Sequence, residues 1–324
     1  MTPHLKEHRV IITGACGAIG FALSKRLAEA GAMVIGLDRA GSQETFAADV
    51  KGSRLYIGDL LNIAFLTNAF QEASKFGSVT AVLHLAGQSD ANQCEVDPPL
   101  AYRQNVILTA NVLEASIKHR ISRFIFPSTA YVYGTEYQEK IKEDFPVLPW
   151  GVYSLTKLSS ETIIKSYVNL GSINADILRI SNTYGPSWKR NTILGDMISQ
   201  AEGNSKIILR NLRVVRDFIY MDDVIEAFMR LIVAERPGCH TLNLSTGQGT
   251  SAGELASLFC DIWGLPQEAV ESPADPKATA SWLVLDNQAL YGRLGWRPSI
   301  STREGLKKIL AILKEQRKIC QNEK

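Results

Sequence analysis

The stretch that decides the fold lies near the N-terminus and reads Arg9-Val-Ile-Ile-Thr-Gly-Ala-Cys-Gly-Ala-Ile-Gly20. It begins as an apolar run of strand length and ends with glycines at positions 14, 17 and 20. Glycines at this spacing between a strand and a helix allow a tight turn, a close approach of the backbone to a pyrophosphate and close helix–strand packing. The free N–H groups of the following helix then face the phosphates. The stretch therefore predicts a dinucleotide-binding βα unit.

A carboxylate follows at the end of the next apolar run. Asp38 closes the run Met33-Val-Ile-Gly-Leu37, about 20 residues beyond the glycines, where such sites carry an acidic residue. A carboxylate at this place accepts hydrogen bonds from both ribose hydroxyls and repels a 2′-phosphate, which favours NAD. Arg39 beside it could pair with that phosphate, so NADP stays open as the alternative.

Further along the chain, strand-like runs without polar alternation are separated by helical patterns. We expect strands over residues 9–13, 33–37, 54–58, 80–85, 123–126 and 175–179. We expect helices over residues 19–30, 60–76, 101–119 and 153–170. Strands that are apolar on both faces and alternate with helices are typical of a parallel sheet covered on both sides. The sequence thus predicts an α/β fold, a Rossmann-type doubly wound parallel sheet, with a dinucleotide-binding domain in residues 1–182.

Beyond residue 182 the pattern changes. Pro and Gly become commoner in the loops, and the strand-like runs shrink to 206–209, 217–220 and 241–244. Helical patterns remain over 222–234, 252–263 and 302–316. We interpret residues 183–324 as a smaller C-terminal substrate-binding lobe that returns some elements to the first domain.

The composition excludes several classes of protein. With 35 Lys+Arg against 33 Asp+Glu, the net charge is only +2, which argues against a nucleic-acid protein with a strong basic field. The apolar runs are too short for a membrane span, and residues 1–8 lack the apolar segment of a signal peptide. The cysteines are scattered, odd in number and free of Cys-x-x-Cys, which favours reduced thiols and a cytoplasmic location. We expect no metal site.

A second group of polar residues indicates acid–base chemistry. Tyr153 and Lys157 are spaced i, i+4, so a helix places them on one face. There the Lys157 ammonium would stabilise a tyrosinate and lower the pKa of Tyr153 from its usual value of about 10. Ser128 and Thr129 offer two hydroxyls at the carboxyl end of the run over 123–126.

Together these motifs resemble those of the short-chain dehydrogenase/reductase superfamily. Gly58-Asp-Leu60, His84-Leu-Ala-Gly87 and Asn105 are similar to its cofactor-binding segments. By its place before Val132-Tyr-Gly134, Thr129 is implied as the third catalytic residue beside Tyr153 and Lys157. The resemblance implies a cofactor site made of Gly14, Gly17, Ala18, Ile19, Gly20, Asp38, Arg39, Asp59, Leu60, Leu85, Ala86, Gly87, Asn105, Tyr153 and Lys157.

The second half of the chain narrows the resemblance to the extended branch, the NAD-dependent nucleotide-sugar epimerases, dehydratases and ketoreductases. The similar segments are residues 179–186, 215–223, 242–247 and 294–298. The resemblance implies that Asn182 and Arg216 hold the diphosphate of a nucleotide sugar, since an amide and a guanidinium suit phosphate oxygens. It implies substrate contacts from Ser128 and Thr129 as well. Dimers are common in this family, which leaves a homodimer open.

Two departures from the family pattern bear on the reaction. Many members carry a second phosphate-binding arginine where this chain reads Ser272-Pro-Ala-Asp-Pro-Lys277, so Lys277 is the candidate substitute. Nucleotide-sugar 4,6-dehydratases carry acidic residues directly after the catalytic hydroxyl residue, where this chain has Ala130 and Tyr131. The acid and base that eliminate water are therefore missing, which argues against dehydration.

We therefore expect an NAD-dependent nucleotide-sugar epimerase, in the first place a 4-epimerase of the UDP-glucose type. Tyr153 would remove the proton of the sugar hydroxyl while Thr129 orients its oxygen. The alternative is a reductase of nucleotide 4-keto-6-deoxy-sugars, because residues 209–212 resemble the Gly-Asn-Leu segment of GDP-mannose-type reductases and dehydratases. A 4,6-dehydratase is less favoured. So is a non-catalytic NAD(P)-binding sensor, which would lack the Tyr153 and Lys157 pair.

Overall fold

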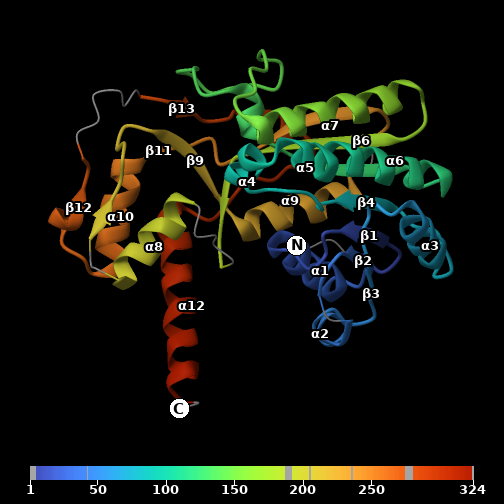
Figure 1. The fold of residues 1–324 in the computed structure, drawn as a ribbon, viewed down its shortest axis with the longest axis horizontal. Coiled ribbons are helices and arrows are strands. Elements are labelled where there is room, and N and C mark those ends of the chain that lie inside the picture. The colour runs from blue at the N-terminus through green and yellow to red at the C-terminus, as the bar shows by residue number, and fades with distance from the viewer. Residues whose placement is uncertain are drawn as a thin grey trace.

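A parallel sheet forms the centre of the computed structural model, which describes residues 5–41, 43–186, 192–203, 206–234, 236–273 and 280–322. Its strands are β1 Arg9–Thr13, β2 Met33–Asp38, β3 Arg54–Ile57, β4 Ala81–His84, β5 Arg123–Thr129, β6 Asn174–Ile180 and β10 Cys239–Leu244. The seven strands pair in the order β10-β6-β5-β4-β1-β2-β3, all in parallel. The order reverses between β1 and β4, which is where ligands bind in sheets of this kind. The predicted doubly wound sheet is confirmed (Figure 1).

Helices cover both faces of this sheet (Figure 1). They are α1 Ala18–Glu29, α2 Gln43–Asp49, α3 Ile63–Ser74, α6 Leu108–Lys118, α7 Val152–Asn169, α9 Met221–Val233 and α11 Gln288–Leu294. Alternate side chains of a strand point to opposite faces, so in β1 Val10 and Ile12 enter one core and Ile11 enters the other. The first core is closed by α1, α2, α9 and α11, and the second by α3, α6 and α7.

A smaller lobe lies beside the sheet, on the left of Figure 1. Its strands are β7 Asn182–Tyr184, β8 Ile207–Ile208, β9 Val215–Tyr220, β11 Gly249–Ser251, β12 Val270–Glu271 and β13 Trp282–Leu283. Its helices are α8 Ile193–Gly203, α10 Ala252–Trp263 and α12 Thr302–Asn322, with a 3₁₀ turn at Gln267–Ala269. β9 pairs with β7, β11 and β13. Phe218 of β9 shares a separate apolar core with Met197, Phe259 and Leu306.

The chain after residue 182 also contributes to the large sheet. β10 pairs with β6 along its whole length, and α9 packs against α1. The elements of the two predicted domains are therefore interleaved in space, and a division of the chain at residue 182 stays a prediction.

One departure from the predicted elements concerns the site. The helix predicted over 101–119 consists of α5 Pro98–Tyr102, a π-helical turn Arg103–Ile107, and α6. A short helix α4 Ala91–Val96, capped by the Asp90 carboxylate, precedes it and was not predicted. A π turn has wider hydrogen bonding than an α-helix and is frequent at functional sites. Here it carries the buried Asn105.

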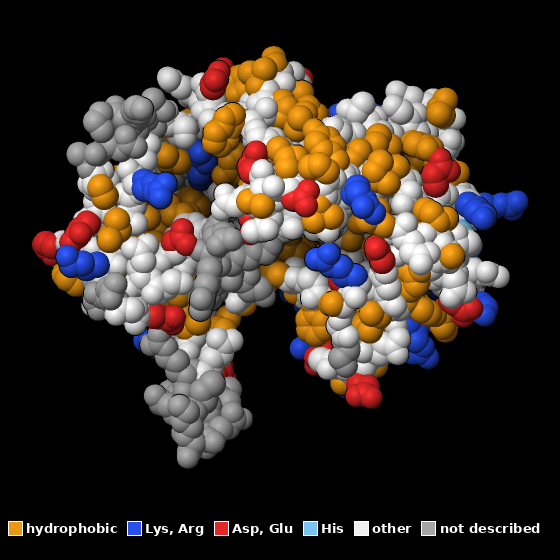
Figure 2. Space-filling model, viewed as in Figure 1, with side chains coloured by type: hydrophobic (Ala, Val, Ile, Leu, Met, Phe, Trp, Pro, Cys, Tyr) orange, Lys and Arg blue, Asp and Glu red, His pale blue; other side chains and the backbone are white. Residues whose placement is uncertain are grey.

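Two further observations come from the described residues. None of their helices combines the length and the apolar character needed to cross a membrane. They hold no group of three or more His, Cys, Asp and Glu side chains placed to bind a metal. On the face that Figure 2 shows, Lys and Arg side chains are interspersed with Asp and Glu.

Candidate active site

The glycine loop between β1 and α1 packs directly against the end of β4. Gly14 has a φ of 70°, and a Cβ on it would lie 2.8 Å from the Ala86 nitrogen. A Cβ on Gly20 would lie 2.0 Å from the Gly14 carbonyl oxygen. Both positions therefore require glycine for packing. Gly17 and Ala18 are instead exposed, so they leave the loop open to a close approach from outside.

Asp38 and the start of α1 supply the groups that a dinucleotide needs. No side chain caps α1 at Gly17, so its first N–H groups are available to phosphate oxygens. The Asp38 carboxylate accepts hydrogen bonds from the backbone N–H groups of Cys16 (2.8 Å) and Arg39 (2.7 Å), which holds it beside the loop. Open glycine backbone, a helix N-terminus and a carboxylate at the end of β2 together fit NAD.

The remaining predicted adenine-side residues lie at the end of β3. Asp59 is exposed, and its carboxylate accepts a hydrogen bond from the Leu61 N–H at 2.9 Å. Leu60 is buried in the second core. Their contacts with a cofactor stay predictions.

A buried histidine joins the ends of β1 and β4 to α6. His84 Nδ1 lies 2.7 Å from Thr13 Oγ1, and its Nε2 lies 3.1 Å from Thr109 Oγ1. Because Thr109 donates its hydroxyl hydrogen to the Asn105 carbonyl, it accepts from Nε2–H, and Nδ1 accepts from Thr13. Burial, and then the charge of Lys157, lower the pKa of His84 to about 3. His84 is therefore a neutral structural group.

Asn105 shapes the loop behind the predicted cofactor site. Its Oδ1 accepts from the Gln88 N–H at 2.7 Å, and its Nδ2 donates to the Gln88 carbonyl at 3.1 Å and to Thr156 Oγ1 at 2.9 Å. A Cβ on Gly87 would lie 2.6 Å from Asn105 Oδ1. Asn105 thus fastens residues 85–88, with the predicted Leu85 and Ala86, to α7.

Tyr153 and Lys157 lie on α7 beside the end of β5, but the structure does not pair them. Lys157 Nζ donates to the Pro127 carbonyl at 2.8 Å and lies 4.5 Å from the centre of the Phe126 ring. The Tyr153 hydroxyl makes no hydrogen bond within the described part of the chain. Burial lowers the pKa of Lys157 to about 8.

The predicted lowering of the Tyr153 pKa is wrong for this structure. Burial raises that pKa, and the nearby Cys94 and Tyr131 raise it further. Burial is the main cause, and the Lys157 ammonium does not offset it because it donates to the Pro127 carbonyl of β5.

The two hydroxyls that follow β5 differ in their surroundings. Ser128 is buried, and its hydroxyl donates to Glu161 Oε1 at 2.5 Å. Thr129 Oγ1 accepts from the Tyr131 N–H at 3.3 Å, and its hydroxyl hydrogen has no acceptor among the described residues. The hydroxyl hydrogen of Ser128 is therefore used inside the protein, and its predicted contact with substrate stays a prediction. Thr129 keeps a free donor.

Sequence reasoning missed the residue that Ser128 contacts. The Glu161 carboxylate is fully buried and accepts from Arg179 Nη2 at 2.7 Å and Nε at 3.1 Å. Glu161 lies four residues after Lys157, as Lys157 lies four residues after Tyr153. Extending this i, i+4 series would have found it. The ion pair locks α7 to β6 beneath the site.

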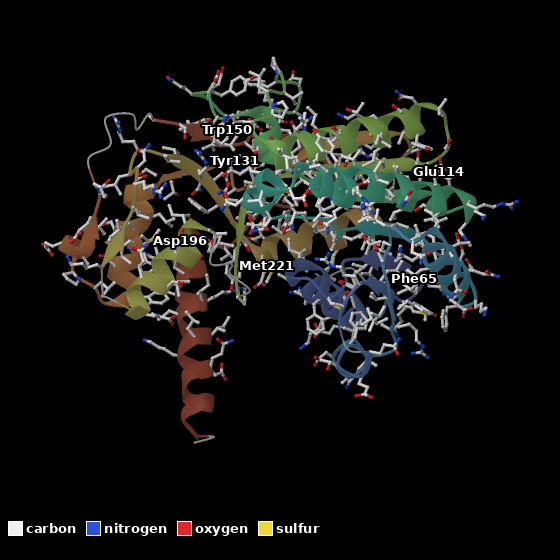
Figure 3. The ribbon with its side chains drawn as sticks, in the orientation of Figure 1. Phe65, Glu114, Tyr131, Trp150, Asp196 and Met221 are labelled. Atoms are coloured by element: carbon white, nitrogen blue, oxygen red, sulfur yellow. The ribbon has the colours of Figure 1, made fainter. Side chains whose placement is uncertain are left out.

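The two predicted phosphate-binding residues come together around Tyr131. Asn182 begins β7 and Arg216 lies in β9, and these strands pair in parallel. Asn182 Nδ2 lies 3.4 Å from the Tyr131 hydroxyl, and the Arg216 guanidinium lies 5.9 Å from the centre of its ring. Figure 3 shows Tyr131 where the sheet and the smaller lobe meet. Lys277 lies outside the described residues.

The comparisons with known proteins agree with this arrangement. A model of the NAD dependent epimerase/dehydratase family matches residues 10–244, from β1 to the last residue of β10. The chain belongs to this family. It is thus an NAD-dependent enzyme of the epimerase/dehydratase type, and the sequence prediction of NAD as its cofactor is confirmed.

Relatives that match over their whole length have different activities. The UDP-glucose 4-epimerase of Mycolicibacterium smegmatis is 28% identical, covering 95% of this chain and 99% of that protein. The dTDP-6-deoxy-L-talose 4-dehydrogenase (NAD(P)+) of Kitasatospora kifunensis is 26% identical, with 95% and 96% covered. The structure of UDP-glucose 4-epimerase from Thermotoga maritima with UDP-glucose has a TM-score of 0.83 at 25% identity, with 95% and 99% covered. Family membership therefore establishes the type of enzyme, and the specific reaction must be inferred from the residues of the site.

Proposed function

We propose that the protein is a 4-epimerase of a nucleotide-diphosphate sugar, of the UDP-glucose type. The observation that carries the proposal is that α7, with Tyr153 and Lys157, packs against β5 and the turn after Thr129, while Asn182 and Arg216 of the smaller lobe contact Tyr131 in that turn. The full-length relative named UDP-glucose 4-epimerase supports it. So does the similar epimerase structure that holds UDP-glucose.

Each residue has a role that its position supports. Tyr153, whose hydroxyl is free, would remove the proton from the sugar hydroxyl and later return it. This role requires that its pKa, which burial raises, falls when the positively charged nicotinamide binds beside it. Thr129 donates its free hydroxyl hydrogen to the same sugar oxygen and orients it. Lys157 places a positive charge at the end of β5, and Arg216 with Asn182 holds the diphosphate. NAD, when bound at the glycine loop, would accept the hydride of the sugar and give it back.

The residues after Thr129 support epimerisation over dehydration. Ala130 is 1% exposed and has no group that could protonate a leaving hydroxyl. Tyr131 has a phenol where the dehydratases of the resemblance carry a carboxylate. Elimination of water needs an acid and a base at these places, and this chain has neither carboxylate.

The second candidate is a reductase that gives a keto sugar a hydride without taking it back. The relative from Kitasatospora kifunensis, named a 4-dehydrogenase of a dTDP-sugar, favours it. It would use the same Thr129, Tyr153 and Lys157, and it differs in consuming its reduced cofactor.

The first experiment identifies the small molecules released when the purified protein is denatured, by mass spectrometry. Retained NAD and conversion of UDP-glucose to UDP-galactose without added reductant are expected for the epimerase. Tyr153→Phe is expected to lower kcat by at least about 100-fold, because the proton acceptor is lost. Protein that is free of NAD and consumes reduced cofactor on a keto sugar would replace the first candidate by the second.

We also propose that the enzyme is a homodimer in a reducing compartment such as the cytoplasm. Val96, Leu100, Ile107 and Leu155 are exposed on neighbouring helical segments, and Figure 2 shows apolar side chains gathered over this region. Such a patch is typical of a contact surface. Sedimentation of the wild type and of Ile107→Asp tests the dimer, since a charge in this patch should give a monomer.

The described Cys16, Cys94, Cys239 and Cys260 are free thiols, which supports the proposed reducing compartment.

A further inference from the structure

Tyr131 is the open side chain of the turn that follows the catalytic threonine. In this 3₁₀ turn, Ala130–Tyr133, the other three residues are at most 1% exposed, whereas Tyr131 is partly exposed. Its N–H donates to Thr129 Oγ1 at 3.3 Å. The backbone thus fixes the ring next to the hydroxyl that orients the substrate.

Two residues of the smaller lobe reach the same ring. Asn182 Nδ2 lies 3.4 Å from its hydroxyl, and the Arg216 guanidinium lies 5.9 Å from its centre. A cation at this distance from an aromatic face is attracted by the ring quadrupole. Tyr131 therefore borders the pair that is proposed to hold the diphosphate.

On its other side Tyr131 borders the catalytic phenol. The 3₁₀ turn that carries Tyr131 packs against α7, the helix that carries Tyr153, and Tyr131 contributes to the raised pKa of Tyr153. A molecule with its phosphates at Asn182 and Arg216 and its reacting hydroxyl at Tyr153 must therefore cross Tyr131. In a nucleotide-diphosphate sugar, the part between the phosphates and the reacting hydroxyl is the sugar ring.

We propose that Tyr131 is a specificity-determining residue that forms a wall of the sugar subsite and recognises the sugar rather than the nucleotide. The proposal rests on the proposed function, because it takes the substrate to be a nucleotide-diphosphate sugar. An aromatic face offers a flat apolar surface to the C–H groups of a pyranose, and the phenol hydroxyl can hydrogen-bond to a sugar oxygen.

The anchoring of Arg216 explains why the sugar and not the diphosphate should depend on Tyr131. Arg216 Nη1 donates to the Val215 carbonyl at 2.8 Å and to Ser281 Oγ at 3.0 Å. These two hydrogen bonds do not involve Tyr131, so they should keep the Arg216 guanidinium in place in a variant that lacks the Tyr131 ring. Loss of Tyr131 should then weaken the contact with the sugar and leave the diphosphate site in place.

Isothermal titration of the NAD-supplemented protein with UDP and UDP-glucose, and with dTDP and dTDP-glucose, tests the proposal. Tyr131→Leu should weaken binding of the preferred nucleotide sugar by about 3- to 10-fold, the usual size of an aromatic contact. It should change binding of the matching diphosphate by less than about twofold. Tyr131→Phe keeps the ring and should retain most of the affinity. In turnover, Tyr131→Leu should raise KM more than it lowers kcat.

Tyr291→Leu is the matched control. Tyr291 is exposed and also lies under an arginine, with the Arg297 guanidinium 4.0 Å from its ring centre. It lies on α11, outside the proposed sugar subsite. Equal weakening of sugar and diphosphate by Tyr131→Leu would show that the ring only holds Arg216, and unchanged binding would show no role. Either result overturns the proposal and leaves the proposed function standing. A wild type that binds no nucleotide sugar overturns both.

Discussion

At the scale of single residues, burial at the strand ends biases three groups of the site towards their neutral forms. It lowers the pKa of His84 to about 3 and that of Lys157 to about 8, and it raises that of Tyr153. The common cause is the cost of removing a charge from water. The same exclusion of water strengthens every hydrogen bond that a bound substrate makes there.

His84 makes stability depend on acid. The pKa of His84 is about 3 in the folded chain, against an ordinary value of 6.5. Below pH 6.5 the histidine is therefore protonated in the unfolded chain and stays neutral in the folded chain. The contribution of neutral His84 to the free energy of unfolding is fully present above pH 6.5. It falls as the pH decreases, by about 2 kcal/mol between pH 8 and pH 5. In urea denaturation the wild type should lose about 2 kcal/mol more than His84→Gln between pH 8 and pH 5. Parallel curves for the two proteins would contradict it.

At the scale of elements, the junction of β1 and α1 depends on Gly20. A Cβ there would lie 2.0 Å from the Gly14 carbonyl oxygen. This oxygen belongs to the backbone of a tight loop, which cannot shift enough to relieve the clash. Gly20→Ala is therefore expected to destabilise the protein by about 1–3 kcal/mol or more and to weaken NAD binding, as measured by thermal unfolding and by titration with NAD.

Gly292→Ala is the control for this helix glycine. It lies in α11, and a Cβ on it would meet nothing within 4 Å. Since alanine favours a helix by roughly 0.5–1 kcal/mol over glycine, this change should be neutral or stabilising. A Gly20→Ala protein as stable as Gly292→Ala would refute the packing argument.

At the scale of the whole molecule, one buried carboxylate ties distant segments together. Asp176 of β6 pairs with Arg123 of β5 at 2.5 Å and with Arg293 of α11 at 2.6 Å. Both arginines also donate to the Ala234 carbonyl just beyond α9, at 3.3 Å. The cluster thus joins the first part of the chain to elements that follow residue 182.

Removing the Asp176 carboxylate should lower the free energy of unfolding of the protein. Asp176→Asn leaves two buried guanidinium groups without their counter-charge, and such a loss costs about 3–5 kcal/mol. Asp261→Asn is the control, because its pair with Arg303 is about half exposed and is worth only about 0–1 kcal/mol. Midpoints of urea denaturation compare the two. Equal midpoints would show that the buried cluster contributes nothing.

The sequence by itself determined the strands of the large sheet, most of the helices and the kind of cofactor. The glycines at 14, 17 and 20, the apolar runs and Asp38 predicted the sheet, most of its helices and NAD, because each pattern reflects the geometry of near neighbours in the chain. The helices α2, α8 and α11 were not predicted. The π turn at Asn105 and the short α4 were missed as well, since no periodicity marks an inserted residue or a single helical turn.

Only the tertiary structure decided which partner each site residue has. Lys157 turns to the Pro127 carbonyl, Ser128 donates to Glu161, and Tyr131 meets Asn182. These partners are 30, 33 and 51 residues apart. Spacing along a helix or strand fixes the face on which a residue lies. The residue that it meets depends on how the elements pack, because burial and charge are shared between segments that are distant in the sequence.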